Sequence, residues 1–80
     1  MSRYFLQLRD HTEETLDPEG VHCPSLDALR EHVLTSARDL MTGDVRRGVI
    51  DLRFRIDAED EQGAIVHTLP FKDAVRVISE

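Results

Sequence analysis

The sequence has one cysteine, no tryptophan and no long apolar run. The lone thiol, Cys23, cannot form an internal disulfide, which excludes a disulfide-stapled secreted domain. No apolar run approaches the roughly 20 residues that a membrane-spanning helix needs. Residues 1–4 lack the apolar segment and the small-residue cleavage site of a signal peptide, so we expect a cytoplasmic protein.

Basic residues are also in short supply. Ten lysine and arginine residues stand against 16 acidic ones, for a net charge of −6, and Lys72 is the only lysine. A field of this sign repels nucleic-acid phosphates and anionic lipids, so the charge argues against nucleic acid and membrane as partners. A nucleic-acid role would need a local basic patch.

What is present is enough for one folded domain. The chain has 80 residues, of which 40% are hydrophobic and 32% charged, with both signs mixed along it. This composition is typical of a folded chain rather than a disordered one, and the length leaves no room for a second core. We therefore expect a single domain over residues 1–80.

A long amphipathic helix is the clearest element. Ser25 can cap it, Asp27 places negative charge in its first turn, and Arg46, Arg47 and Gly48 are typical of a C-terminus. We predict a helix from residue 26 to residue 47 that continues through Gly43. Its apolar stripe consists of Leu26, Leu29, Val33, Ala37, Leu40, Met41 and Val45.

Strands are predicted on both sides of the helix. Residues 3–9 form the first strand, and strict alternation over residues 50–57 predicts another, with Ile50, Leu52, Phe54 and Ile56 on its buried face. The acidic turn at 59–63 connects it to a strand over 64–69, which makes a β-hairpin, and Pro70 interrupts that strand or marks an edge. Two segments stay open: a strand near 20–23 or 14–16, and a helical turn or a final strand over 71–78.

These elements predict an α+β two-layer sandwich in β-β-α-β-β order, a small antiparallel sheet covered on one face by a single amphipathic helix. The opposite face then has no helix to cover it and leaves room for a partner protein or a second copy. The candidate interaction surface consists of Asp51, Arg53, Arg55 and Asp57 on that face, with Arg46 and Arg47 at the helix end. Plain exposure to solvent, with Arg and Asp pairing across strands, is the alternative.

Catalytic and metal chemistry find little support. His11, His22 and Cys23 lack the spacing of a zinc site, and Cys23 is expected to be a buried, unreactive thiol. The sequence places no base or oxyanion hole beside Cys23 or Ser25. Carboxylates near the hairpin turn are expected to be solvated: Asp57, Glu59, Asp60 and Glu61. We expect no enzyme, no metal and no cofactor.

Several short motifs lie at the two ends of the chain and before the helix: the opening Tyr4-Phe5-Leu6-Gln7-Leu8-Arg9-Asp10, Asp17 with Gly20, Leu26 with Ala28, and the closing Leu69-Pro70-Phe71 followed by Asp73-Ala74-Val75. Together they resemble an uncharacterised family of small stand-alone proteins found in rhizobia and related proteobacteria. Members commonly have glycine where this chain has His11, and often histidine in place of Gln7. The family is a domain of unknown function, so the resemblance implies a folded bacterial protein and no activity.

The sequence thus favours a small, non-catalytic bacterial protein-binding or adaptor domain that docks a partner, or its own copy, through the uncovered sheet face or an exposed strand edge. The alternative is an antitoxin-like or regulatory module that contacts nucleic acid through Arg46, Arg47, Arg53 and Arg55. The order of elements is similar to that of HicB-type antitoxins, without their attached DNA-binding segment.

Overall fold

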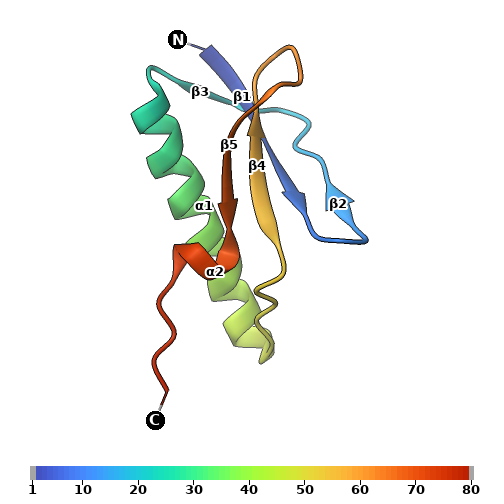
Figure 1. Ribbon diagram of the computed structural model, residues 1–80, viewed down its shortest axis with the longest axis vertical. Coiled ribbons are helices and arrows are strands. Elements are labelled where there is room, and N and C mark those ends of the chain that lie inside the picture. Colours follow the sequence, from blue (N-terminus) through green and yellow to red (C-terminus); the bar gives the residue numbers. More distant parts are fainter. Residues whose placement is uncertain (1, 80) are drawn as a thin grey trace.

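The computed structural model describes residues 2–79 and confirms the predicted fold class, a small antiparallel sheet with one long helix on one face (Figure 1). Both weakly indicated strands in the 12–24 segment are present, so three strands precede the helix. The elements are β1 (Ser2–Arg9), β2 (Glu14–Thr15), β3 (Val21–Cys23), α1 (Leu26–Arg47), β4 (Arg55–Glu59), β5 (Ile65–Pro70) and α2 (Phe71–Ala74).

Strand β1 lies at the centre of the sheet. It pairs antiparallel with β4 on one side and, on the other, with β3 along its first half and β2 at its end. The hairpin partner β5 pairs with β4 and completes the order β2-β1-β4-β5. The register aligns Gln7 with Asp57 and Asp57 with Thr68, which places these three side chains on the same face.

Helix α1 has the predicted bounds because its end signals are local. The Ser25 hydroxyl accepts a hydrogen bond from the Ala28 amide at 3.1 Å, which satisfies one of the orphan donors of the first turn. Gly48 takes a left-handed conformation with φ of 86° and closes the C-terminus through hydrogen bonds to Asp44 and Val45. Gly43 does not end the helix.

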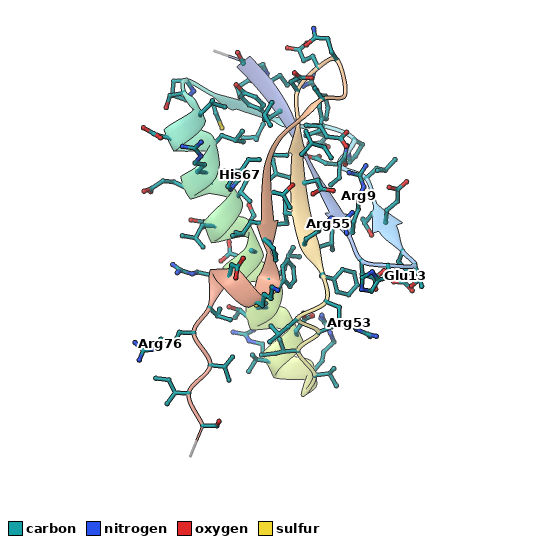
Figure 2. The ribbon with its side chains drawn as sticks, viewed as in Figure 1. Arg9, Glu13, Arg53, Arg55, His67 and Arg76 are labelled. Carbon is teal, nitrogen blue, oxygen red and sulfur yellow. The ribbon has the colours of Figure 1, made fainter. Side chains whose placement is uncertain are left out.

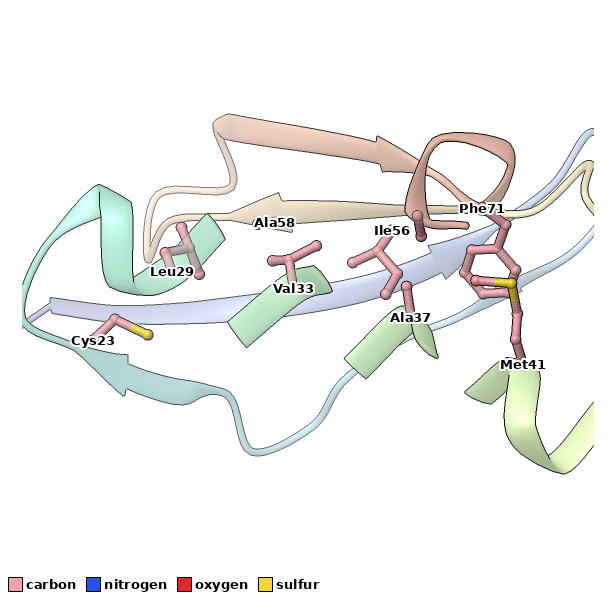
Figure 3. Close-up of a cluster of buried hydrophobic side chains, with 9 residues drawn as sticks. Cys23, Leu29, Val33, Ala37, Met41, Ile56, Ala58 and Phe71 are labelled. Carbon is pink, nitrogen blue, oxygen red and sulfur yellow. The ribbon is translucent and has the colours of Figure 1, made fainter. Parts of the chain in front are cut away.

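The core lies between α1 and the sheet (Figure 3). Every fourth residue of the helix, Leu29, Val33, Ala37 and Met41, is buried against Ile56 and Ala58 of β4, with Cys23, Phe71 and Ala74 at the margins. The predicted stripe is too wide, since Leu26, Leu40 and Val45 are exposed. A single helix on a narrow sheet buries one row of side chains and leaves the flanks of its apolar face in solvent.

The predicted strand over residues 50–57 is wrong at its start, because β4 begins at Arg55. Its partner β1 ends at Arg9, which pairs with Arg55, so earlier residues have no strand to pair with. Asp51 also accepts hydrogen bonds from the Arg53 amide and guanidinium, which holds this segment in a turn. Ile56 is buried as predicted, Leu52 and Phe54 pack at the edge of the core, and Ile50 is exposed.

The C-terminal segment begins as a helical turn. β5 ends at Pro70, as predicted for that residue, and α2 follows at once with Phe71 and Ala74 buried. The Phe71 amide donates to the Phe54 carbonyl oxygen at 2.9 Å, and the Arg38 guanidinium donates to the Ala74 carbonyl oxygen at 2.9 Å. Val75 still packs against the core, and residues 76–79 then extend away from the body of the molecule (Figure 1).

Candidate interaction surfaces

The face of the sheet opposite α1 is closed by an ion-pair network around Arg9. Its guanidinium donates to three carboxylates, those of Glu14, Asp57 and Glu59, each at 2.9 Å. Figure 2 shows Arg9 beside Arg55 over the middle of the sheet. These hydrogen bonds hold the pKa of Arg9 above its ordinary value. The network joins β1, β2 and β4.

Asp57 is the buried centre of this network, with 2% of its surface exposed. It accepts hydrogen bonds from Arg9, from Arg55 at 3.2 Å and from the Thr68 hydroxyl at 2.9 Å. Burial alone would raise the pKa of Asp57, but the hydrogen bonds from Arg9 and Thr68 and the charge of Arg55 outweigh it and lower the pKa. The predicted solvated position of Asp57 is therefore wrong, because long side chains from β1 and β4 cover it.

Gln7 extends the polar network toward the turn at residues 17–20. Its side chain donates to Glu59 at 3.3 Å and accepts from the Asp17 amide at 2.7 Å. Asp17 in turn accepts from the amides of Glu19 and Gly20 at 3.1 Å and of Leu6 at 3.2 Å. Burial opposes ionisation of Asp17, but these amide hydrogen bonds prevail and lower its pKa. The polar side chains on this side of the sheet therefore find their hydrogen-bond partners within the chain.

The structure does not gather the six predicted surface residues into one patch. Arg55 and Asp57 belong to the network on the sheet. Asp51 and Arg53 pair with each other in the turn before β4, and the Arg53 hydrogen bonds lower the pKa of Asp51 to about 2. Arg46 and Arg47 lie at the end of α1, in its last turn.

A shallow cationic hollow forms where the Asp51–Arg53 turn meets the end of the sheet. It has a volume of about 410 Å³. Its lining residues are His11, Leu52, Arg53, Phe54, Arg55, Pro70 and Lys72, and none of them is acidic. Two of its three fixed cations already pair with aspartates outside the lining, Arg53 with Asp51 and Arg55 with Asp57. Lys72 joins them from α2, an association that the sequence did not suggest.

Strand β5 presents an open edge. Within residues 2–79 its only strand partner is β4, so the amide and carbonyl groups of its outer side have no ladder partner. No residue from Ile65 to Pro70 carries a full charge, and Ile65, Val66 and Thr68 are exposed. The sequence predicts an exposed strand edge but does not indicate which strand provides it. The run of uncharged residues from Gly63 to Phe71 was the available signal.

A groove runs along the other flank of α1, between the helix and strands β1 and β3. Its volume is about 560 Å³. The sides of the groove carry polar residues from one stripe of α1, namely His32, Ser36 and Asp39, with Asp17 and Gly20 across from them. Its apolar lining residues are Leu6, Leu8, Val21, Leu40 and Ile56. The groove could not be predicted from the sequence, because the spacing of Leu40 places it on the apolar stripe of α1.

The candidate metal ligands lie in unlike environments. Cys23 is a free thiol in the core, as predicted for a buried cysteine. Its neighbour His22 is exposed on the same strand, since adjacent strand residues point to opposite sides. His11 is exposed in the turn between β1 and β2.

None of the helices in the described part of the chain combines the length and the apolar character that a bilayer crossing requires.

The fold and these surfaces define a small α+β domain with one long helix on its sheet, an internally paired open sheet face and a free strand edge. The family model described as a domain of unknown function (DUF6894) matches residues 3–72, and the chain belongs to this family. The predicted membership in a family of unknown function is thereby confirmed. No match is found among curated proteins or among solved structures.

Proposed function

We propose that this protein is a non-catalytic protein-binding or adaptor module that pairs the outer edge of β5 with an extended segment of a partner protein. The observation that carries the proposal is the uncharged, exposed edge of Ile65–Pro70. An added strand gains main-chain hydrogen bonds from such an edge, and alternate side chains provide specificity. Natural sheets usually protect free edges with lysine, proline or bulges.

Protection of the β5 edge is confined to its two ends. A register shift at Ala58/Glu59 lies near the hairpin turn, and Pro70 stands at the far end. Between them the strand carries no lysine and no other charge. The charged sheet face is a less suitable docking surface than the β5 edge, because Arg9 and Asp57 already pair with each other there. A partner docking there would have to break ion pairs that are already formed.

The proposal places the module in a bacterial cytoplasm. The opening and closing motifs resemble those of rhizobial proteins, which supports a bacterial origin. The single buried Cys23 is compatible with a reducing compartment. The absence of an enzymatic role is part of the same proposal.

The test compares three forms of the protein as affinity baits. Val66→Lys adds a charge to the exposed first half of β5 and leaves the Thr68 hydrogen bond to Asp57 intact. Gln62→Lys adds the same charge to the hairpin turn as a matched control. We expect proteins retained by the original chain to be retained by the Gln62→Lys form and lost with Val66→Lys. Equal retention by all three folded forms would contradict the proposal, as would the absence of any specific partner.

A second candidate function is contact with a nucleic-acid backbone at the cationic hollow. The observation in its favour is that Arg53, Arg55 and Lys72 line one hollow without an acidic residue. Binding of mixed DNA and RNA at low salt, weakened steeply by added salt and by Lys72→Glu, is the expected signature. Lack of binding at low salt would exclude it. The pairing of Arg53 and Arg55 with aspartates favours the first candidate.

A further inference from the structure

The last residues of the described chain form an exposed arm. Val75 has an extended backbone, with φ of −138° and ψ of 158°, and the chain then leaves the molecule (Figure 1). Val77 and Ile78 are 72% and 79% exposed, the highest fractions among the large hydrophobic residues within 2–79. Arg76 directly precedes Val77 in the chain, and its side chain points into solvent in Figure 2. The arm therefore offers apolar side chains next to one positive charge.

The groove between α1 and strands β1 and β3 has complementary chemistry. It presents apolar side chains from the sheet and the helix, with Leu40 44% exposed. Two carboxylates, Asp17 and Asp39, also line it and come from opposite sides. Asp17 is held in the ionised form by the amide hydrogen bonds that lower its pKa. An apolar segment with a single cation suits such a groove, because burial and charge attraction act together.

The arm cannot easily reach the groove of its own chain. It leaves α2 beside Arg38, whose guanidinium binds the Ala74 carbonyl oxygen, whereas Ser36 lines the groove. Residues two positions apart are about 200° apart around a helix, so the two sites flank α1 on different sides. A path of roughly 14 Å around the outside of a 10 Å wide helix uses about four extended residues. Val77 and Ile78 would then lie on the back of the helix rather than in the groove.

We propose that the arm, residues 76–79, docks into this groove on a second copy of the chain, with Arg76 between Asp17 and Asp39 of that copy. Exchange of arms between two copies is reciprocal, so it closes as a symmetric dimer. Two four-residue arms contribute less area than the roughly 1,200–2,000 Å² of a standard stable interface. The dimer is therefore expected to dissociate on dilution. The inference uses a surface separate from the β5 edge and does not rest on the proposed partner binding.

The first test is the mass of the full chain by light scattering or sedimentation over a wide concentration range. We expect the mass to rise from one chain toward two. Ile78→Asp on the arm and Leu40→Asp in the groove should each weaken association at least tenfold. Val49→Asp is the matched control, since Val49 is 70% exposed outside both surfaces. A chain that stays monomeric at all concentrations, or an equal effect of the control, would overturn the proposal.

Charge reversal tests the role of Arg76 without relying on burial. Arg76→Glu should weaken dimerisation, and adding Asp39→Arg should restore it by placing opposite charges together again. Both positions are exposed, so these variants are expected to fold. Failure of the second substitution to restore any association would contradict the placement of Arg76 beside Asp39.

Cysteine cross-linking identifies which copy holds the arm. Mixing a Ser36→Cys chain with a differently tagged Ile78→Cys chain should give a disulfide between the two, while Val49→Cys mixed with Ile78→Cys should give far less. The native Cys23 can remain because it is buried. A disulfide formed within one monomeric chain carrying both new cysteines would overturn the second copy as the occupant. Loss of partner retention on Val66→Lys, by contrast, would test only the β5 edge.

Discussion

At the scale of the residue, Asp57 shows what pattern analysis misses. Alternation along residues 51–57 correctly places Asp57 opposite Ile56, on the face away from α1. It does not reveal that Arg9, 48 positions away, will cover this carboxylate. A buried charge depends on neighbours brought by strand pairing, and pairing cannot be derived from the spacing within one strand.

Replacing Asp57 by asparagine should destabilise the fold by about 2 kcal/mol. The substitution keeps the shape but removes the negative charge that Arg9 and Arg55 share, and hydrogen bonds to charged groups contribute roughly 1.5–3 kcal/mol each. Urea unfolding followed by circular dichroism measures the change. Asp27→Asn, at a carboxylate that is 93% exposed, is the control and should shift stability by less than about 0.5 kcal/mol. Equal effects of the two would show that the network contributes nothing.

Stability should fall in acid because the folded state lowers the pKa of both Asp57 and Asp17. A lowered pKa means that the unfolded chain binds protons first, so the stabilisation is complete well above the ordinary value of 3.8. It is lost as pH falls through that value toward the folded-state pKa. Urea midpoints measured between pH 7 and pH 2.5 should show this decline. The decline should be shallower for Asp57→Asn, and an identical acid profile would contradict the assigned role of Asp57.

At the scale of the element, local signals were sufficient for α1 and insufficient for β4. The helix begins and ends at the predicted residues because Ser25 and Gly48 each interact with backbone groups of the adjacent helical turn. β4 starts later than predicted because β1, its partner, ends at Arg9. The choice between a helical turn and a strand after Pro70 likewise depended on burial of Phe71, which only the assembled core provides.

The turn before β3 should be sensitive to the size of residue 20. Gly20 has φ of 76°, and a Cβ there would lie 2.8 Å from the Tyr4 carbonyl oxygen. Gly63 has a similar φ of 83° but open space around it, which makes it a matched control. Gly20→Ala should be more destabilising than Gly63→Ala by at least about 1 kcal/mol. Both substitutions place alanine at a positive φ, but only the Cβ at position 20 also clashes with a backbone oxygen. Similar unfolding midpoints for the two variants would contradict this close approach.

Within α1, Gly43→Ala should stabilise the protein. The added methyl group would meet only the end of the Arg47 side chain, at 3.6 Å. Alanine is favoured over glycine inside a helix by up to about 1 kcal/mol. A thermal melt should show a midpoint raised by a few degrees. A lower midpoint would indicate that the helix is not continuous through this position.

At the scale of the whole molecule, one helix on a two-faced sheet was predictable, and the use of the uncovered face was not. The molecule is only 18 Å thick along its shortest axis, as expected for two layers. The face away from α1 was the predicted docking surface, but Arg9, Asp57 and their neighbours pair there internally. Among the described residues, the β5 edge and the groove beside α1 are surfaces without such internal pairing. The identity of the edge strand and the groove both depend on how the strands assemble.

The most direct measurement is amide hydrogen exchange, residue by residue, for the dilute chain and for the chain bound to a retained partner. We expect the outward-facing amides of β5 to exchange rapidly in the dilute chain, while those of β1 and β4 stay protected. Partner binding should protect the β5 amides and leave the Asp57 network unchanged. Strong protection of the whole of β5 in the dilute chain, or a partner that leaves its exchange unaltered, would contradict the proposed binding edge.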